Sequence, residues 1–332
     1  MDRISTIWRQ LELQRPEAQG LLRIRYSAEL TAEVFLGLLT AERERCLLLR
    51  VNAGILKSSQ PDRSLRGLKI EKIADPLQPD SVFLTLILLN PHAQEIFDTL
   101  IQDIINKVMP LADEKRILKT FIERIDTWRS LFEKPDPETL STEARQGLYG
   151  ELYFLRKWIL NSPEDKSRCV YAWLGVDKDL RDFQSGNWAI EVKTTRGNNH
   201  QKIQVASERQ LDPSLLDKLW LYHLSLEVQQ KNGENLNQIV DAVIELLKED
   251  VPLVTELKSR LLKGGYFTIH RPFYEDSGYQ LRSEAFYIIK DNFPRLEERM
   301  IPKGVGDVKY TIILSDYSEY IVNESLVFET IS

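Results

Sequence analysis

The sequence is poor in cysteine, with only Cys46 and Cys169 in 332 residues. The two lie far apart and lack metal-ligand spacing, which argues against a disulfide framework or a cysteine zinc site and fits a reducing cytoplasm. Long apolar runs are also missing: the longest, residues 82–89, is far too short to span a bilayer. The first residues lack the basic and then apolar regions of a signal peptide. We therefore expect a cytoplasmic protein without a membrane segment.

An excess of positive charge is missing as well. Lysine and arginine number 44 against 50 aspartate and glutamate, which gives a formal net charge of −6. Proteins that bind nucleic acid unaided are more often basic, because neutralising phosphates drives their affinity. The charge counts against strong autonomous DNA binding, but it leaves open a local basic groove or a partner that brings the DNA. No glycine-rich loop that would cradle phosphates occurs, so we expect no ATP hydrolysis by this chain.

Residues 1–135 are typical of a β-rich domain followed by a helical linker. Residues 21–26, 46–51 and 81–88 have strand composition, and turn-like stretches separate them. Two amphipathic helices follow, because apolar residues recur at helical spacing. These residues are Ile96, Leu100, Ile104 and Val108 in the first helix, and Ile117, Phe121, Ile125 and Trp128 in the second. Pro135 and Pro137 then break the pattern and mark a domain boundary.

Residues 138–332 mix helices and strands. Ser141 is a suitable N-cap for a helix over 142–160, and Ser207 for a short helix further on. Further helices are expected over 236–248 and 252–262. Strands are expected near 170–174, 180–183, 188–195, 202–205, 218–228, 285–290 and 308–314. This order predicts an α/β (α+β) fold in which a mixed sheet is flanked by helices.

Three Glu-x-Lys triplets occur, and their contexts differ. The triplet at Glu164 follows a proline in a polar loop, and the one at Glu256 lies in a helical pattern, where positions i and i+2 do not face each other. Only Glu191 lies in an expected strand, where a period of two places Glu191 and Lys193 on one face. Asp307-Val308-Lys309 also begins a strand, but no nearby strand supplies a second acid.

A second acid does precede the Glu191 triplet. Eight residues separate Asp182 from Glu191, and residues 184–187 among them have turn composition, so a β-hairpin would bring both carboxylates to one edge of the sheet. Two such acids suit Mg²⁺, with the backbone carbonyl of Val192 as a third ligand. Lys193 would then hold the attacking water and offset developing negative charge. On spacing alone, an exposed ion pair worth about 0–1 kcal/mol is an equally good reading.

Glu151 favours the metal site over the surface ion pair. In the helix over 142–160 it shares a face with Leu148, Leu155 and Trp158. A carboxylate in an apolar stripe is costly to bury unless it is paired or meets a metal. The glycines at 147 and 150 would be explained by a close approach of this helix to the sheet. The alternative is that Glu151 reaches solvent from the edge of the stripe.

These residues resemble the motifs of the PD-(D/E)XK nuclease superfamily. The matching segments are Gly-Leu-Tyr-Gly-Glu-Leu at 147–152, Arg-Asp-Phe at 181–183 and Ile-Glu-Val-Lys-Thr-Thr at 190–195. The closer resemblance is to a bacterial PD-(D/E)XK family encoded in phage-defence gene clusters together with MutL-like and Z1-type ATPases. By motif it covers roughly residues 142–211, with Arg181 standing where the superfamily pattern has proline.

The resemblance implies a restriction-endonuclease-like mixed sheet flanked by helices, preceded by the β-rich domain. Asp182, Glu191 and the Val192 carbonyl would bind Mg²⁺, with Mn²⁺ as a substitute. Glu151 would assist from the first core helix, and Lys193 would promote hydrolysis. The implied function is a metal-dependent DNA endonuclease within a defence or restriction-like system, with ATPase subunits as partners.

Four further residues are candidates for contacts with nucleic acid. Arg196, His200 and Lys202 follow the Glu191 strand in a basic, polar stretch and would meet phosphates beside the scissile bond. A solvated loop is at least as good an explanation for each of them alone. The resemblance adds Gln210, a glutamine near the site.

Two functional hypotheses compete. In the first, the chain is an endonuclease; in the second, the nuclease fold persists as a non-catalytic scaffold and the N-terminal domain docks ATPase partners. The net charge favours dependence on partners in either case, while the filled positions 182, 191 and 193 favour the enzyme. A branched DNA or RNA substrate is a variant of the first hypothesis. Cutting both strands of a duplex would favour a homodimer or two successive nicks.

Overall fold

The structure is a computed structural model of the chain. It describes residues 3–15, 20–56, 63–65, 67–132, 139–177, 180–196, 201–306 and 308–332. The chain divides into two compact units, Met1–Pro137 and Glu138–Ser332, which we call the N-terminal unit and the C-terminal unit. The expected linker around Pro135 and Pro137 and the triplet residue Asp307 lie outside the described residues.

The N-terminal unit is built on an antiparallel sheet with the strand order β1-β2-β3-β6-β5-β4. Its strands are β1 (Leu21–Arg25), β2 (Val34–Leu39), β3 (Glu44–Asn52), β4 (Arg63–Leu65), β5 (Leu68–Ala74) and β6 (Ser81–Leu88). Its helices are α1 (Arg3–Leu13), α2 (Ala53–Leu56), α3 (Gln94–Val108) and α4 (Glu114–Phe132), with a 3₁₀ turn η1 (Pro91–Ala93). The expected strands β1, β3 and β6 and both amphipathic helices are confirmed.

Helices α3 and α4 form where the apolar spacing predicted them. The stripe residues of both helices are buried, with exposed fractions of at most 4 %. Between the helices, Asp103 accepts hydrogen bonds from Arg124 Nε at 2.6 Å and from Trp128 Nε1 at 2.9 Å. The buried carboxylate is therefore paired, as burial of a charge requires. Helix α1 was not predicted, although Ile4, Trp8 and Leu11 form a buried helical stripe.

The C-terminal unit contains a mixed sheet with the strand order β11-β12-β10-β8-β7, and β14 pairs with β12. The strands are β7 (Phe183–Ser185), β8 (Trp188–Arg196), β10 (Lys218–Gln230), β11 (Glu234–Asn235), β12 (Ser277–Ile288) and β14 (Ile321–Val322). Strands β8 and β10 run parallel, whereas β7 is antiparallel to β8 and β12 to β10. A separate antiparallel pair joins β9 (Lys202–Val205) to β13 (Tyr310–Ile313).

Helices cover this sheet. They are α5 (Thr142–Asn161), α6 (Lys166–Tyr171), α7 (Leu236–Leu247), α8 (Val251–Lys263) and α9 (Glu324–Ile331). Short 3₁₀ turns are η2 (Pro163–Asp165), η3 (Gly175–Asp177), η4 (Thr268–Tyr274), η5 (Glu298–Met300), η6 (Leu314–Asp316) and η7 (Ser318–Tyr320). This mixed sheet with flanking helices confirms the predicted α+β, nuclease-like fold.

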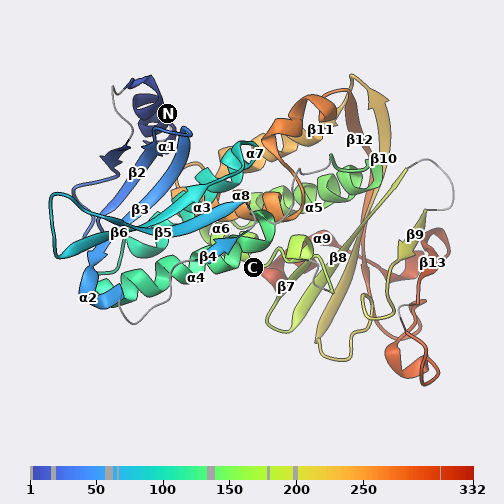
Figure 1. Cartoon of the computed structure of the whole chain (residues 1–332). Coiled ribbons are helices and arrows are strands. Elements are labelled where there is room, and N and C mark those ends of the chain that lie inside the picture. Colours follow the sequence, from blue (N-terminus) through green and yellow to red (C-terminus); the bar gives the residue numbers. More distant parts are fainter. Residues whose placement is uncertain are drawn as a thin grey trace. The chain divides into compact units, whose positions relative to one another are not determined.

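The two faces of the sheet pack against different layers. Ile190 and Val192 of β8 join a core cluster with α5 and α7, and Figure 1 shows α5 running alongside β8 and β10. Ala189 of β8 and Leu221 of β10 point to the opposite face, where they pack with residues of β9 and β13. Alternate residues of β8 are thus buried on either side, and Glu191 shares the face of Ala189.

Gly150 of α5 allows the helix to approach β8 closely. A Cβ atom at Gly150 would lie 2.3 Å from Cγ2 of Thr194, so even alanine would not fit without movement. At Gly147, by contrast, a Cβ atom would meet nothing within 4 Å. The close approach predicted from both glycines is therefore confirmed for Gly150 and wrong for Gly147.

Two local predictions are wrong. Residues 170–174 were expected to form a strand, but Val170 and Tyr171 end α6, and within the segment only Trp173 forms an isolated β-bridge, with Phe183. Helix α6 is capped by Asp165, which accepts a hydrogen bond from the Arg168 amide at 3.2 Å. The expected helix after Ser207 is only a turn, in which Gln210 N donates to Ser207 O at 3.1 Å.

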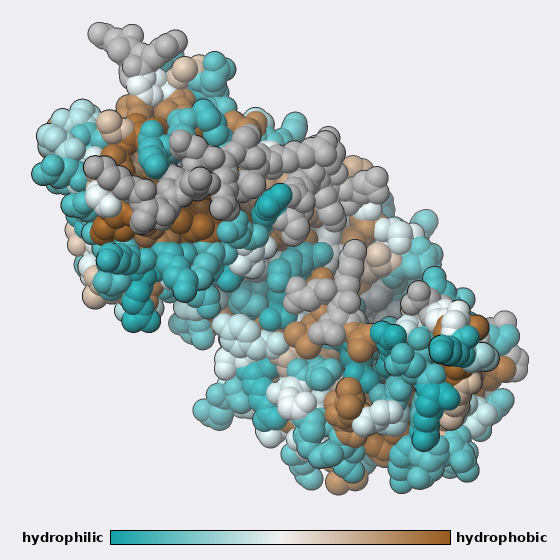
Figure 2. Space-filling model, turned by 60° about the horizontal axis from the view of Figure 1, so that its bottom comes forward, coloured by the Kyte–Doolittle hydropathy of each residue, from teal (hydrophilic) through white to brown (hydrophobic). Residues whose placement is uncertain are grey.

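Within the described ranges no helix is long and apolar enough to cross a membrane. Large exposed apolar side chains do occur, for example Leu215 and Phe273. On the face drawn in Figure 2, hydrophilic residues predominate among the coloured atoms.

Candidate active site

The β7–β8 hairpin aligns the two acids found in the sequence. Its register pairs Phe183 with Ile190 and Ser185 with Trp188, around a two-residue turn that begins at Gly186 with φ of 59°. A positive φ at the first turn position suits glycine, which has no Cβ atom to clash. One further step along this register places Asp182 opposite Glu191. The predicted hairpin is confirmed, but its first strand is Phe183–Ser185 instead of 180–183 and its turn is shorter than the predicted 184–187.

Asp182 is bound to the backbone of the neighbouring strand. Its Oδ2 accepts a hydrogen bond from the amide of Val192 at 2.7 Å. The N–H and C=O groups of one residue in a strand point to the same side, so the Val192 carbonyl also points to the edge that carries Asp182. This orientation agrees with the expected role of that carbonyl as a ligand.

Glu191 and Lys193 form an ion pair. Lys193 Nζ lies 2.6 Å from Glu191 Oε1, and the two side chains are 19 % and 1 % exposed. The alternation of β8 places them on one face, as predicted. Beyond this pair, neither Glu191 oxygen accepts a well-formed hydrogen bond from any residue that the structure describes. The ion pair is therefore not the exposed surface pair that was the alternative. Because the Glu191 oxygens accept no other hydrogen bond from the described residues, they are available to a ligand.

Glu151 reaches the same edge of the sheet from α5. Its Oε2 accepts a hydrogen bond from the indole Nε1 of Trp173 at 2.6 Å. A Cβ atom placed on Gly175 would lie 2.8 Å from Glu151 Oε2 and 2.7 Å from Asp182 Oδ1. The two carboxylates therefore approach a common point. The Glu151 carboxylate therefore does not reach out to solvent, which was the alternative. It points towards Trp173 and Asp182.

The electrostatics of the four groups are strongly coupled. Burial, followed by the nearby Glu191, raises the pKa of Glu151 to about 7, although the Trp173 hydrogen bond opposes the shift. Burial, Glu191 and Glu151 raise the pKa of Asp182 well above its usual value. Burial also raises the pKa of Glu191, while Lys193 partly offsets it. Three acids against one ammonium leave an excess of negative charge that a divalent cation would neutralise.

The donor set fits a hard cation, but the side chains do not yet surround a common position. Carboxylate and carbonyl oxygens are ligands that Mg²⁺ prefers, and two carboxylates with several waters suffice for it. In the described parts of the chain, no group of three or more His, Cys, Asp or Glu side chains stands at metal-binding spacing. Glu191 would have to turn from Lys193 towards the Asp182 edge to share an ion.

The residues expected to contact nucleic acid are not clustered as the acids are. Arg196 donates to the side chain of Gln146 and to the carbonyl of Thr142 at 3.0 Å, so it is fastened to α5. Lys202 is exposed on β9, and His200 lies outside the described residues. Gln210 Oε1 accepts from the Ala206 amide at 2.8 Å and stabilises a turn. Contacts of all four with nucleic acid stay predictions.

The other acid–lysine triplets offer no comparable geometry. Glu256 lies on α8 and pairs with Arg260 at 2.9 Å. Glu164 lies in η2, and Lys166 begins α6 and donates to the carbonyl of Leu246 at 2.8 Å. Of the three Glu-x-Lys triplets, only the one at Glu191 lies in a strand, as predicted.

His223 is a buried neighbour of Lys193. It lies opposite Lys193 in the parallel β8–β10 register, is 1 % exposed, and forms a hydrogen bond between its Nε2 and Thr195 Oγ1 at 2.9 Å. Burial lowers the pKa of His223 to about 4. The ring is therefore neutral at physiological pH.

We expect His223→Gln to weaken the acid dependence of stability. The unfolded chain binds the histidine proton near pH 6.5 and the folded protein near pH 4, so stability is full above pH 6.5 and is lost as the pH falls towards 4. Between pH 7 and pH 5 the wild type should lose about 2 kcal/mol of unfolding free energy that the variant keeps. Denaturant unfolding at both values tests this; equal losses in the two proteins would contradict it.

Sequence reasoning missed Trp173 and Gly175. Trp173 is 0 % exposed and reads as an ordinary core tryptophan, and its partner Glu151 is 22 positions away in the chain. Gly175 has no local motif that distinguishes it from a turn glycine. Only the tertiary fold places both against the acids.

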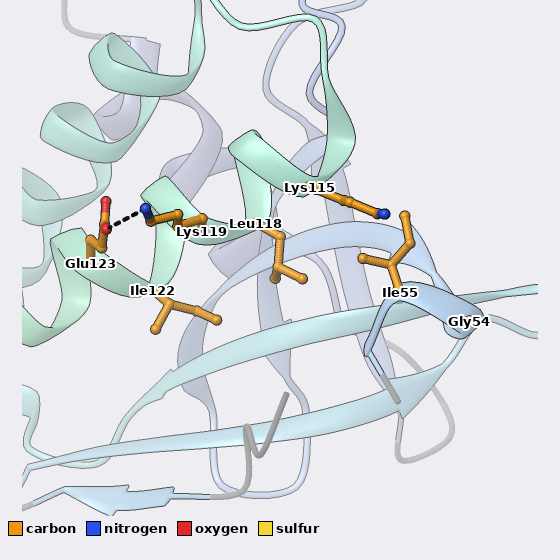
Figure 3. Close-up of a pocket in the computed structure, with 7 residues that line it drawn as sticks. All are labelled: Gly54, Ile55, Lys115, Leu118, Lys119, Ile122 and Glu123. Atoms are coloured by element: carbon orange, nitrogen blue, oxygen red, sulfur yellow. Dashed lines mark ion pairs between the residues drawn. The ribbon is translucent and has the colours of Figure 1, made fainter. Parts of the chain in front are cut away.

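A groove of about 600 Å³ in the N-terminal unit is lined by residues other than those of the Asp182 and Glu191 site. Its described lining residues are Gly54, Ile55, Lys115, Leu118, Lys119, Ile122 and Glu123. Figure 3 shows Lys119 and Glu123 directed towards each other, with 3.6 Å between Nζ and Oε1. Glu123 is the sole acid among these lining residues, so the groove lacks paired carboxylates that would hold a catalytic cation.

Comparison with known families identifies the family of the chain. The model of a family described as "Putative PD-(D/E)XK family member, (DUF4420)" matches residues 4–315. Neither the curated proteins nor the solved structures gave a match. The matched range reaches far beyond the motif region 142–211 and includes nearly all of the N-terminal unit. The chain therefore belongs to the DUF4420 family, which is described as a putative PD-(D/E)XK family member.

Proposed function

We propose that the protein is a metal-dependent DNA endonuclease that hydrolyses phosphodiester bonds. The observation that carries the proposal is the convergence of Glu151 and Asp182 beside Gly175, one register step from the buried Glu191–Lys193 pair. The buried Glu191 and the half-buried Glu151 and Asp182, all three with raised pKa values, are unfavourable beside one ammonium in a purely structural role. Perturbed acids gathered in this way are typical of functional sites. Membership of a PD-(D/E)XK family supports a nuclease over other hydrolases.

Each residue then has a role in the proposed reaction. Asp182, Glu191 and the Val192 carbonyl would hold Mg²⁺, or Mn²⁺ as a substitute, with Glu151 assisting. The bound ion would supply Lewis acidity at a non-bridging phosphate oxygen. Lys193 would hold the attacking water and stabilise negative charge that develops on the phosphate oxygens. Arg196, His200, Lys202 and Gln210 are proposed to contact the nucleic acid.

We further propose that the enzyme works as a subunit of a bacterial anti-phage defence or restriction-like system. The resemblance of residues 147–152, 181–183 and 190–195 to a family encoded beside ATPases supports this. The net charge of −6 is consistent with help from a partner in binding DNA. The N-terminal unit is the proposed docking part for ATPase subunits or DNA, and a homodimer would suit cleavage of both strands.

The test is cleavage of supercoiled plasmid by the purified full chain with Mg²⁺, with Mn²⁺ and with EDTA. We expect metal-dependent nicking or linearisation, and we expect Asp182→Ala to abolish it, because the acid that holds the cation is gone. Cleavage that persists in Asp182→Ala would refute the site.

If neither protein cleaved the plasmid, even with the proposed ATPase partners added, the proposal of an endonuclease would be refuted. That result would support the second candidate function, a non-catalytic scaffold. In favour of that candidate, the described acids do not stand at metal-binding spacing without a ligand.

A further inference from the structure

Residues 173–175, which we call the clasp, follow α6, end at the first residue of η3 and approach Glu151 and Asp182. Trp173 donates its indole N–H to Glu151 Oε2 at 2.6 Å. Its ring is 0 % exposed, so water does not compete for that hydrogen bond. The indole therefore restricts the Glu151 carboxylate to one orientation.

The clasp also fixes the backbone of Asp182. The carbonyl of Asp182 accepts two hydrogen bonds, from the amide of Leu174 at 2.7 Å and from the amide of Gly175 at 3.0 Å. An isolated β-bridge between Trp173 and Phe183 continues this pairing. Asp182 precedes the first residue of β7, Phe183, so it lies outside the paired part of the hairpin. The two hydrogen bonds from the clasp fix its backbone instead.

Gly175 sets the space between the acids. A Cβ atom there would lie 2.7 Å from Asp182 Oδ1 and 2.8 Å from Glu151 Oε2, closer than real Cβ contacts. The φ angle of Gly175 is not in the left-handed region, so alanine would be tolerated by the backbone itself. The cost of a side chain would fall on the two carboxylates, which would have to move apart.

Helix α8 holds the clasp through Arg260, which contacts the backbone of Trp173. Arg260, which is 7 % exposed, donates from its guanidinium to the carbonyl of Trp173 and pairs through Nε with Glu256 at 2.9 Å. The clasp is thus held by a charged side chain from a separate helix. Such support would keep Trp173 in place whether or not a ligand occupies the site.

We propose that Trp173 and Gly175 are positioning residues that fix the spacing and orientation of Glu151 and Asp182 for divalent cation binding. The inference rests on the proposed function, because it assigns the cation to these acids. Groups that orient metal ligands commonly contribute a factor of about 10–100 to metal affinity. The clasp would act through the two acids and touch neither the ion nor the DNA.

The experiment compares Trp173→Phe with Trp158→Phe in the full chain. Both tryptophans are 0 % exposed, but the Trp158 Nε1 has no hydrogen-bond partner among the described residues, so that variant loses only packing. We expect Trp173→Phe to weaken Mn²⁺ binding, measured by calorimetry, by about 10–100-fold. Trp158→Phe should lower the melting temperature similarly and leave Mn²⁺ affinity unchanged. Equal Mn²⁺ affinities of the two variants would overturn the inference.

Gly175→Ala and Gly147→Ala form a second pair, which decides the question if Trp173→Phe does not fold. Gly175→Ala should weaken Mn²⁺ binding, whereas Gly147→Ala, with nothing within 4 Å of its Cβ atom, should not. In a Glu151→Ala background, Trp173→Phe should cause no further loss of affinity, because its effect passes through Glu151. A full additional loss there would overturn the role of Trp173. If the wild type bound no Mn²⁺, the proposed function would fail. If the wild type bound Mn²⁺ and the variants bound it equally well, only the role of the clasp would fail.

Discussion

Lys193→Met is expected to slow plasmid cleavage by about 10²–10³-fold, the loss typical for removal of one group that stabilises transition-state charge. Methionine keeps the length and the apolar stem of lysine but has no ammonium group. Mn²⁺ should bind at least as tightly as in the wild type, because the ammonium that competes for Glu191 Oε1 at 2.6 Å is gone. Single-turnover cleavage and calorimetry would measure the two effects separately.

The same substitution should have a stability signature. Without metal, the nearly buried Glu191 loses its partner, which costs about 3–5 kcal/mol when a buried pair is broken in this way. Added Mg²⁺ should recover most of that loss by replacing the ammonium. Lys258→Met is the matched control, because Glu256-Leu257-Lys258 is also a Glu-x-Lys triplet but lies on α8. Undiminished cleavage by Lys193→Met would rule out its proposed role.

Asp182→Asn is expected to raise the melting temperature in EDTA while abolishing metal-dependent cleavage. Burial, Glu191 and Glu151 raise the pKa of Asp182 well above its usual value, so the charged form is unfavourable in the folded protein. Asparagine can still accept the Val192 hydrogen bond and carries no charge. The expected outcome is a more stable protein in which Mg²⁺ no longer raises the melting temperature.

The pH dependence of this effect has a definite sign. A carboxyl group whose pKa is raised by folding holds its proton more tightly in the folded state, so it destabilises the protein as the pH rises above its unfolded pKa. The gain from Asp182→Asn should therefore be small at pH 4 and larger at pH 8, both in EDTA. Asp250→Asn is a suitable control, since Asp250 caps α8 and the two residues are about equally good N-caps. A lower melting temperature for Asp182→Asn at pH 8 would show that Asp182 stabilises the metal-free protein.

Much of the fold was predictable because the elements concerned bury one regular face. The stripes of α3 and α4 and the alternation of β8 follow from periodicity alone. The hairpin turn and its register then placed Asp182 opposite Glu191 from local chemistry. Glu151 was found because a charge interrupts an apolar stripe. These inferences depend on contacts within one element or between neighbours in the chain.

What the sequence did not reveal depends on contacts between distant segments. The apolar residues at 169–174 suit a short strand as well as a helix, and the cap by Asp165 decided for α6. The difference between Gly147 and Gly150 depends on where Thr194 of β8 lies. The hydrogen bond from Trp173 to Glu151 could not be read from the composition of either segment.

The proximity of Glu151, Asp182 and Glu191 also bears on how such a chain would evolve. A single substitution, such as Asp182→Asn, would leave the shape of the side chain intact and is expected to increase stability. Selection for folding alone would favour that change, because most chains sit close to a stability threshold and would gain from losing an unfavourable charge. A lineage that had abandoned catalysis would thus be expected to discard one of these acids early. If the chain is the proposed nuclease, the presence of Glu151, Asp182, Glu191 and Lys193 together is what selection on chemistry would maintain against the advantage of a more stable protein.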